Sequence, residues 1–326
     1  MAINRVSTAN SYDRTLHNIG QRSSELAKSQ EHNSSGKRVL RASDDAVAAT
    51  LAERARNRQL RNEADLRALE SSRTALTQVE SALGDGIELT QQARELIVQA
   101  GNSTLSATDR GILANQIDGL RDQLLEVANR KDTSGLTLFG GLGGGDPAFK
   151  EETGSGAAPD SEVNFYGQNG QYLPTENALP KAVDGSVAWL VNNPSSSGLP
   201  SKNNPDGSTE PNYLFDILEE TAKKLRDPAP TEALSTTVGN ALSDVDQALE
   251  NMRMVRGQAG QWLNRADSME SLFQDRDLFH EQEISDLTDL DPVKGYSEFQ
   301  TQQLALNAAL QSYAQVQKKS LFQYMA

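Results

Sequence analysis

The chain has 326 residues, a formal net charge of −14, 37% hydrophobic residues and only 5% aromatic residues. That length allows two or three domains of roughly 100–200 residues each, and so little hydrophobic content favours thin helical layers over one large globular core. Net negative charge without a basic run argues against nucleic acid as a partner. The lack of cysteine excludes disulfides and thiolate metal sites.

Within the segment 1–42, residues 3–35 predict a helix with a sparse apolar face that Gly36 interrupts. Leu16, Ile19 and Leu26 share one side of it, but serine, asparagine, glutamine and charged residues separate them. An isolated helix depends on packing such a face against something else. We therefore expect this segment, the N-terminal part of an axial helical domain, to be mobile in the monomer and ordered by neighbouring molecules.

Residues 43–139 predict the N-terminal part of a helical rod. Ser43 is expected to cap a long helix, with Asp44 and Asp45 in its first turn beside the positive helix end. The helix is rich in alanine, leucine, glutamate and arginine. Its apolar stripe recurs at intervals of seven, at Leu69, Leu76 and Leu83.

A second helix is predicted after a turn at residues 101–104. Ser106 and Asp109 have the spacing of a capping box, with aspartate in place of the usual glutamate. The helix is expected to end near Asn129, and the short turn favours an antiparallel return along the first helix. Its apolar stripe consists of Leu113, Ile117, Leu120, Leu124 and Val127.

Residues 140–212 interrupt the helical pattern. This stretch holds 12 of the 24 glycines and 8 of the 11 prolines of the chain. Residues 161–166 and 186–191 are candidate strands, so the segment is predicted to be a small inserted β-rich module.

The helical pattern returns in residues 213–290, the C-terminal part of the rod. A first helix in this segment stops at Pro228 and Pro230, and a long helix follows it. Residues 291–326 predict a last helix, the C-terminal part of the axial domain, with Leu306, Leu310, Tyr313 and Val316 on its apolar side. The long helix between them carries apolar residues at sevens over five heptads: Val238, Val245, Met252, Ala259, Ala266 and Phe273.

A seven-residue apolar repeat buries its stripe only against another helix, so the two halves of the chain are expected to pair with each other. Residues 1–60 carry a net charge of +4 and residues 280–326 a net charge of −3, which favours that pairing weakly. The predicted fold class is mainly α: a long antiparallel coiled-coil-like helical rod built from both chain ends, with a small inserted β-rich module.

No catalytic, metal or cofactor site is predicted. His17, His32 and His280 are too scattered for a zinc site, and Asp44 and Asp45 are adjacent on a helix, so their carboxylates diverge. The glycines of residues 140–145 lack the lysine and hydroxyl residue of a phosphate-binding loop. The chain has no apolar run of 18 residues, so no membrane-spanning segment is predicted. No apolar segment lies near its start, so no secretory signal peptide is predicted.

Several motifs at both ends of the chain, taken together, resemble the flagellin superfamily, and within it the hook–filament junction proteins more than the filament flagellins. The resemblance covers roughly residues 1–141 and 214–326. Its motifs are Ser34-Ser-Gly-Lys-Arg38, Ser43-Asp-Asp-Ala46, the segment 93–104, Asp118-Gly-Leu-Arg-Asp-Gln-Leu-Leu125, Leu136-Thr-Leu-Phe-Gly-Gly141, Gln302-Gln-Leu-Ala-Leu-Asn-Ala-Ala-Leu310 and Ser320-Leu-Phe-Gln323.

The resemblance implies an extracellular structural subunit that joins hook to filament and leaves the cell unfolded through the flagellar type III apparatus. It implies neighbouring copies in a ring, the other junction protein, hook-side or filament-side subunits and an export chaperone as partners, and residues 142–212 facing outward. No cofactor is expected. From the sparse apolar stripes of the two end helices, we predict Leu16, Ile19, Leu26, Leu306, Leu310, Tyr313 and Val316 as assembly contacts.

Two alternatives stay open from the sequence. A short filament flagellin would share the same helical ends. A cytoplasmic helical-hairpin signalling protein would share the heptads, although the glycine- and proline-rich tip of 73 residues argues against it. A hydrolase is more distant, because no nucleophile and base can be paired from the residues present.

Overall fold

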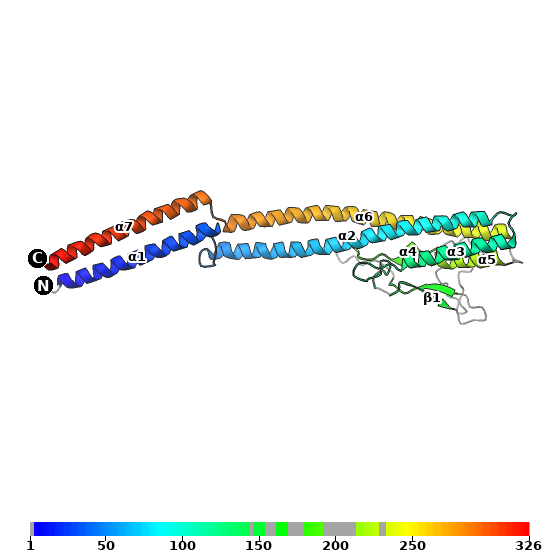
Figure 1. Ribbon diagram of the computed structural model, residues 1–326, viewed down its shortest axis with the longest axis horizontal. Helices are drawn as coiled ribbons and strands as arrows, with labels where there is room; N and C mark the ends of the chain where they lie inside the picture. Colours follow the sequence, from blue (N-terminus) through cyan, green and yellow to red (C-terminus); the bar gives the residue numbers. More distant parts are fainter. Residues whose placement is uncertain are drawn as a thin grey trace. The chain divides into compact units, whose positions relative to one another are not determined.

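The computed structural model describes residues 3–143, 146–153, 161–168, 179–191, 213–227 and 233–325, without the side chains of residues 3–12, 161, 162, 316 and 318–325. The chain forms two compact units, residues 1–64 with 273–326 and residues 65–272. Both divisions fall within long helices, α2 (Ala46–Ala100) and α6 (Leu234–Thr288), so each of these helices contributes a segment to both units. The prediction of a mainly α fold is confirmed (Figure 1).

In the unit of residues 65–272, α2 and α6 pair in antiparallel fashion. The heptad positions predicted for burial are buried, including Leu76 and Leu83 on α2 and Val245 and Met252 on α6. Later residues of α2 pair with earlier residues of α6, as an antiparallel arrangement requires. Three ion pairs show this register: Arg73 Nη1 to Glu270 Oε2 at 2.7 Å, Glu80 Oε1 to Arg256 Nη2 at 2.6 Å, and Arg94 Nε to Asp246 Oδ1 at 2.7 Å.

Helix α3 (Ala107–Ala128) begins and ends where the sequence predicts. The Ser106 hydroxyl accepts a hydrogen bond from the Asp109 N–H at 3.2 Å, and the Asp109 carboxylate accepts from the Ser106 N–H, so the capping box is confirmed. Its stripe is buried at Ile117 and Leu124. Helix α5 (Leu214–Arg226), which packs along α3, has an acidic residue in its first turn and basic residues in its last, as the helix dipole favours.

The inserted segment contains less strand than predicted. Strands β1 (Phe149–Thr153) and β2 (Ser161–Phe165) form one antiparallel hairpin, with Phe149 opposite Phe165. The strand predicted at residues 161–166 is therefore confirmed. The strand predicted at residues 186–191 is wrong: this stretch begins with a short helix, α4 (Gly185–Ala188), because the Asp184 carboxylate accepts a hydrogen bond from the Ser186 N–H and caps it.

The described part of the inserted segment contributes to the core of the unit of residues 65–272. It supplies a cluster of aromatic rings to the core of this unit. The Trp189 ring stacks on Phe215 of α5 at 5.6 Å between centroids, and Phe149 of β1 lies 5.5 Å from Phe215. Each such pair of rings contributes about 0.5–1.5 kcal/mol beyond its buried area, so these contacts hold the hairpin against the helices.

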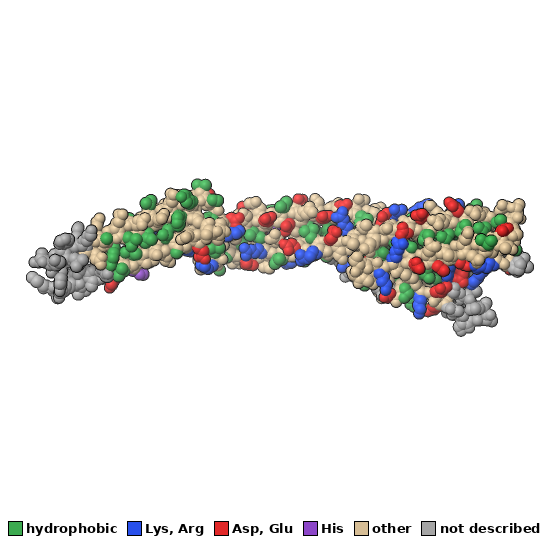
Figure 2. Space-filling model, viewed as in Figure 1, with side chains coloured by type: hydrophobic (Ala, Val, Ile, Leu, Met, Phe, Trp, Pro, Cys, Tyr) green, Lys and Arg blue, Asp and Glu red, His purple; other side chains and the backbone are tan. Residues whose placement is uncertain are grey.

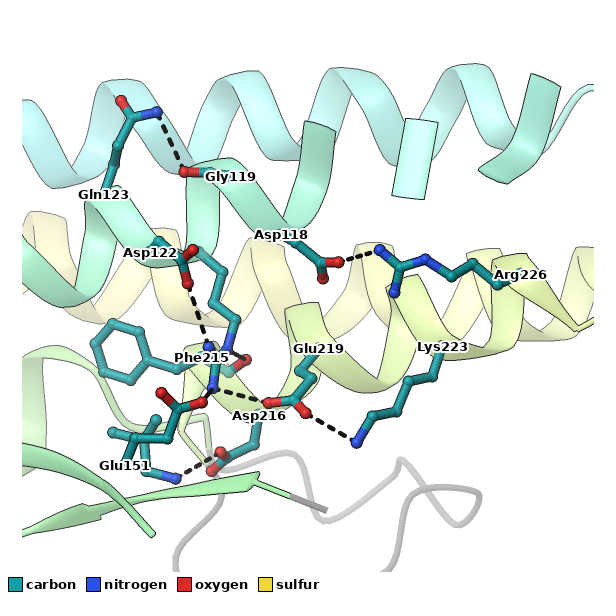
Figure 3. A network of polar contacts seen from close by, with 12 residues as sticks. Asp118, Gly119, Asp122, Gln123, Glu151, Phe215, Asp216, Glu219, Lys223 and Arg226 are labelled. Atoms are coloured by element: carbon teal, nitrogen blue, oxygen red, sulfur yellow. Dashed lines mark hydrogen bonds and ion pairs between the residues drawn. The ribbon is translucent and has the colours of Figure 1, made fainter. Parts of the chain in front are cut away.

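A polar network holds the same layers together (Figure 3). Arg121 of α3 donates to Glu151 of β1 at 2.8 Å and to the Phe215 carbonyl of α5 at 3.2 Å, and it pairs with Glu219 of α5 at 2.8 Å. Asp216, one turn before Glu219, accepts a hydrogen bond from the Val163 N–H of β2 at 2.9 Å. Burial raises the pKa of Asp216 to about 6, although that hydrogen bond and Arg121 favour the charged form.

The unit of residues 1–64 and 273–326 contains α1 (Ile3–Ser35) and α7 (Pro292–Met325), which pack against each other. Within this unit the two chain termini lie at the same end (Figure 1). Helix α1 ends at Gly36, whose φ of 69° is the left-handed conformation that glycine adopts after a helix. Helix α7 begins with Pro292, whose missing N–H costs nothing at a first helical position.

The start of α2 differs by two residues from the prediction. Ser43 does not cap it. The Asp45 carboxylate accepts hydrogen bonds from the Val47 and Ala48 N–H groups at 3.1 and 3.0 Å, so Asp45 is the cap. The Asp44 carboxylate accepts hydrogen bonds from the N–H groups of Leu40 and Arg41, four and three residues earlier, so the two neighbouring aspartates have separate roles.

Candidate assembly surface

The connection between α1 and α2 is tied to the end of α6 by backbone hydrogen bonds. The N–H groups of Arg38 and Val39 both donate to the Thr288 carbonyl, at 2.7 and 3.2 Å, and the Leu290 N–H donates to the Gly36 carbonyl at 2.9 Å. Gly36 and Arg38 belong to Ser34-Ser-Gly-Lys-Arg38, one of the motifs that carry the resemblance. The motif therefore positions the start of α7 beside the end of α1.

Ion pairs at the same connection stabilise the charged form of three aspartates. The Lys28 ammonium, 2.8 Å from Asp44, and the N–H of Arg41 keep the pKa of Asp44 well below its ordinary value. The Ala48 N–H, followed by Arg38, lowers the pKa of Asp45. The Lys37 ammonium lowers the pKa of Asp289. All three carboxylates are therefore ionised at neutral pH and serve as structural anchors, not as acids or bases.

Helices α1 and α7 are in direct contact at Asn33 and Gly295. The Asn33 amide donates to the Gly295 carbonyl at 3.1 Å. A Cβ atom on Gly295 would stand 2.5 Å from Asn33 Oδ1 and 2.5 Å from Leu290 Cδ2, so only glycine fits this position without a shift of its neighbours.

Beyond this point the two helices bury very little. Among the side chains that the structure describes, none on α1 is buried, and on α7 only Gly295 has a buried position. In contrast, the other unit buries a continuous core that includes Trp189, Phe215 and Leu249. A helix pair without buried side chains has little to offset the entropy of its own ordering.

The structure brings most of the predicted assembly residues to this helix pair. Leu16 of α1 and Leu310 of α7 are 44% and 45% exposed. Ile19, Leu26, Leu306 and Tyr313 are half-buried. Val316 lies on α7, but its side chain is outside the described part of the chain.

Three exposed apolar residues of α7 were not among the predicted contacts. Val293, Tyr296 and Leu304 are 80%, 60% and 70% exposed. Figure 2 shows hydrophobic side chains gathered along the face of α1 and α7 that it presents, with few charged ones between them. Leu304 lies two residues before Leu306 and outside the regular apolar stripe of α7, so a search for that stripe does not find it.

The described residues offer little for chemistry at this surface. They contain no group of three or more His, Cys, Asp or Glu side chains placed to hold a metal ion. Among the same residues, no helix has both the length and the apolar character needed to cross a membrane.

Comparison with known proteins identifies helical regions at both ends. The family model "Bacterial flagellin N-terminal helical region" matches residues 6–143, and "Bacterial flagellin C-terminal helical region" matches residues 242–325. The flagellar hook-associated protein 3 of Escherichia coli (strain K12) is 34% identical over 329 residues, covering 98% of this chain and 99% of that protein. A flagellin of Bacillus subtilis (strain 168) is 30% identical, but over 54% of this chain and 59% of its own length.

A solved structure shares the fold. The flagellar hook-associated protein-3 from Legionella pneumophila matches with a TM-score of 0.59 and 18% identity, covering 72% of this chain and 98% of that one. The match to a full-length relative at 34% identity shows the family. The chain therefore belongs to the flagellar hook-associated protein 3 family of the bacterial flagellins, and is an extracellular structural component of the flagellum rather than an enzyme.

Proposed function

We propose that this chain joins the flagellar hook to the filament and assembles there through α1 and α7. The observation that carries the proposal is the absence of buried side chains on the described parts of these two helices, apart from the position of Gly295, together with exposed Leu16, Leu304 and Leu310. Neighbouring subunits are the natural source of the missing burial.

The energies support this division of roles. Fully burying a leucine side chain contributes about 1.5–3 kcal/mol relative to leaving it exposed. Several leucines per copy, covered only after stacking, would make assembly favourable and leave the solitary helices marginal. Marginal helices also suit a protein that leaves the cell unfolded.

The partners follow from this position. We propose neighbouring copies of this chain in a ring, with the other junction protein and hook-side or filament-side subunits above and below it, and an export chaperone before assembly. The predicted contacts Leu16, Ile19, Leu26, Leu306, Leu310, Tyr313 and Val316 belong to this proposal.

A truncation tests the proposal. Deletion of residues 296–326 should leave the thermal transition of the unit of residues 65–272 nearly unchanged, because its core contains no residue of α7. The same deletion should abolish attachment of filaments to hooks in the parent bacterium. Loss of the whole folded core, or normal attachment, would contradict the proposal.

Point substitutions separate the apolar surface from the rest of α7. Leu304→Ser with Leu310→Ser should release filaments from hooks. Gln303→Ser with Gln311→Ser, on exposed neighbouring positions of the same helix, is the matched control and should leave attachment intact. Equal effects of the two pairs would argue against apolar contacts as the basis of assembly.

The partial match to a flagellin makes filament growth the second candidate function. Purified chain added to short filament seeds distinguishes the two. Elongation into long filaments would favour a flagellin, whereas a junction subunit should stop after one layer.

A further inference from the structure

Asp216 occupies the outer edge of the hairpin β1–β2. Val163 lies in the middle of β2, opposite Glu151 of β1, and its N–H donates away from β1, to the Asp216 carboxylate, at 2.9 Å. An edge strand leaves such N–H groups unpaired. Asp216, in the first turn of α5, therefore takes the place of a neighbouring strand and holds β2 against the helix (Figure 3).

A second set of contacts holds the hairpin at its base. The side chain of Asn129, at the end of α3, accepts from the Phe149 N–H and donates to the Phe149 carbonyl, both at 2.8 Å. Phe149 and Phe165 lie opposite each other at this end of the hairpin, with ring centroids 5.1 Å apart. Packed rings and two hydrogen bonds therefore fix the base, whereas Asp216 holds a point further along the strands.

Charged groups from each surrounding element lie near the Asp216 carboxylate. Arg121 of α3 favours its charged form, and Glu219 of α5 opposes it. Both groups have other partners: Glu151 of β1 pairs with Arg121 at 2.8 Å, and Lys223 pairs with Glu219 at 2.8 Å. The positive charge of Arg121 is therefore shared among several carboxylates and is not reserved for Asp216.

Attachment of the hairpin changes how tightly Asp216 holds its proton. Burial raises the pKa of Asp216 to about 6, although the Val163 N–H and Arg121 favour the charged form. The neighbouring Tyr213 stays neutral, because burial raises its pKa to about 12. When β2 leaves α5, water reaches the carboxylate, so its pKa returns toward the ordinary value of 3.8. The attached hairpin therefore binds the proton more tightly than the detached one.

We propose that Asp216 is a pH-sensitive latch: the hairpin detaches from α5 beyond its fixed base at Phe149, and it does so more often as the pH rises. The advantage of the attached state is complete below about pH 4 and is lost as the pH rises through 6. Between pH 5 and pH 7.5, the detached population should increase about tenfold. This inference does not depend on the proposed function, since it concerns the unit of residues 65–272 alone.

Amide hydrogen exchange of the full-length chain measures the detachment. After correction for the intrinsic effect of pH on exchange, protection of the Val163 amide should fall about tenfold from pH 5 to pH 7.5. Its exchange should depend little on urea, because detachment exposes little surface. The Leu124 amide in the core of α3 should be better protected and strongly dependent on urea. Equal protection and equal urea dependence of the two amides would show that the hairpin opens only when the whole unit unfolds, and would overturn the proposal.

A substitution assigns the effect to Asp216. Asp216→Asn keeps the size of the side chain and an oxygen that accepts from the Val163 N–H, but it carries no charge. Protection of Val163 in this variant should be the same at pH 5 and pH 7.5. Asp118→Asn is the matched control, because Asp118 of α3 pairs with Arg226 of α5, and it should keep the native pH dependence. A tenfold change that survives Asp216→Asn would belong to another group and would overturn the proposal.

Thiol labelling provides an independent readout, because the native chain has no cysteine. Val163 is 1% exposed, so Val163→Cys should react with dithiodipyridine only while the hairpin is detached. Tyr166→Cys, at a 46% exposed position just after β2, gives the intrinsic rate at each pH. The ratio of the first rate to the second should rise about tenfold from pH 5 to pH 7.5, and adding Asp216→Asn should make it constant. A constant ratio with Asp216 present would overturn the proposal.

Discussion

Arg121 of α3 and Glu219 of α5 form an ion pair of 2.8 Å in which the arginine side chain is only 6% exposed and the glutamate 15%. Removing one partner of a buried pair leaves an uncompensated charge. We expect Arg121→Ala to destabilise the unit of residues 65–272 by about 3–5 kcal/mol, measured by urea unfolding followed through the fluorescence of buried Trp189.

Arg226 provides the comparison. It joins the same two helices through Asp118, but its side chain is 38% exposed and its partner 34%. Exposed pairs contribute about 0–1 kcal/mol, so Arg226→Ala should cost far less than Arg121→Ala. Similar losses from the two substitutions would show that burial does not decide the strength of this network.

Asp216 should make the stability of the same unit depend on pH. Its pKa rises from 3.8 to about 6 on folding, so the folded state holds the proton more tightly. This stabilisation is fully present below about pH 4 and is lost as the pH rises through 6.

Asp216→Asn should therefore gain stability relative to the native chain between pH 4 and pH 7, by no more than about 3 kcal/mol. Arg121 and Glu219 face Asp216 and are kept unchanged in this comparison. Unfolding at both pH values measures the difference. An offset between variant and native chain that is the same at pH 4 and pH 7 would contradict this assignment.

Gly86 leaves room for Trp189. A Cβ atom at this position would lie 2.8 Å from the Trp189 ring and 3.7 Å from the Met252 sulfur. We expect Gly86→Ala to destabilise the unit by about 1–3 kcal/mol, as overpacking does, and to change the fluorescence of Trp189. Gly119→Ala, at an exposed position of α3 with open space around its Cβ, should instead stabilise the unit by about 0.5–1 kcal/mol.

Gly295 should control how closely α1 and α7 approach. Gly295→Ala places a methyl group against Asn33 and Leu290, so the hydrogen bond from the Asn33 amide should break. The expected results are faster amide exchange near Gly36 and Leu290 and weaker attachment of filaments to hooks. Gly20→Ala, on α1 with nothing within 4 Å of its Cβ, should leave both unchanged. Normal exchange in Gly295→Ala would show that the helices have room to separate.

Much of the helical architecture could be predicted from the sequence, because periodic apolar residues report which side of a helix is buried. The heptads of α6 from Val238 to Phe273 are buried as expected, and the capping box at Ser106 has its predicted bonds. These features are local: a cap or a stripe depends on residues a few positions apart.

The errors lie where distant contacts compete with local patterns. Serine is a common N-cap residue, but Asp45 and not Ser43 caps α2. Hydrogen bonds to the Thr288 carbonyl hold the preceding segment in place and so set where the helix begins. Residues 186–191 were predicted as a strand, yet Asp184 caps a short helix there and Trp189 is buried in the core. The role of Gly86 could not be predicted, since nothing near it in sequence indicates Trp189.

The candidate site was only partly predictable, because a stripe identifies apolar residues and not whether a partner covers them. The helices, the capping box at Ser106 and the two apolar ends could be predicted from the sequence, since each depends on spacing along one helix. Which apolar residues stay exposed, such as Leu304 and Phe279, depends on tertiary packing. Exposure depends on how segments far apart in the chain pack together, and no local pattern records that.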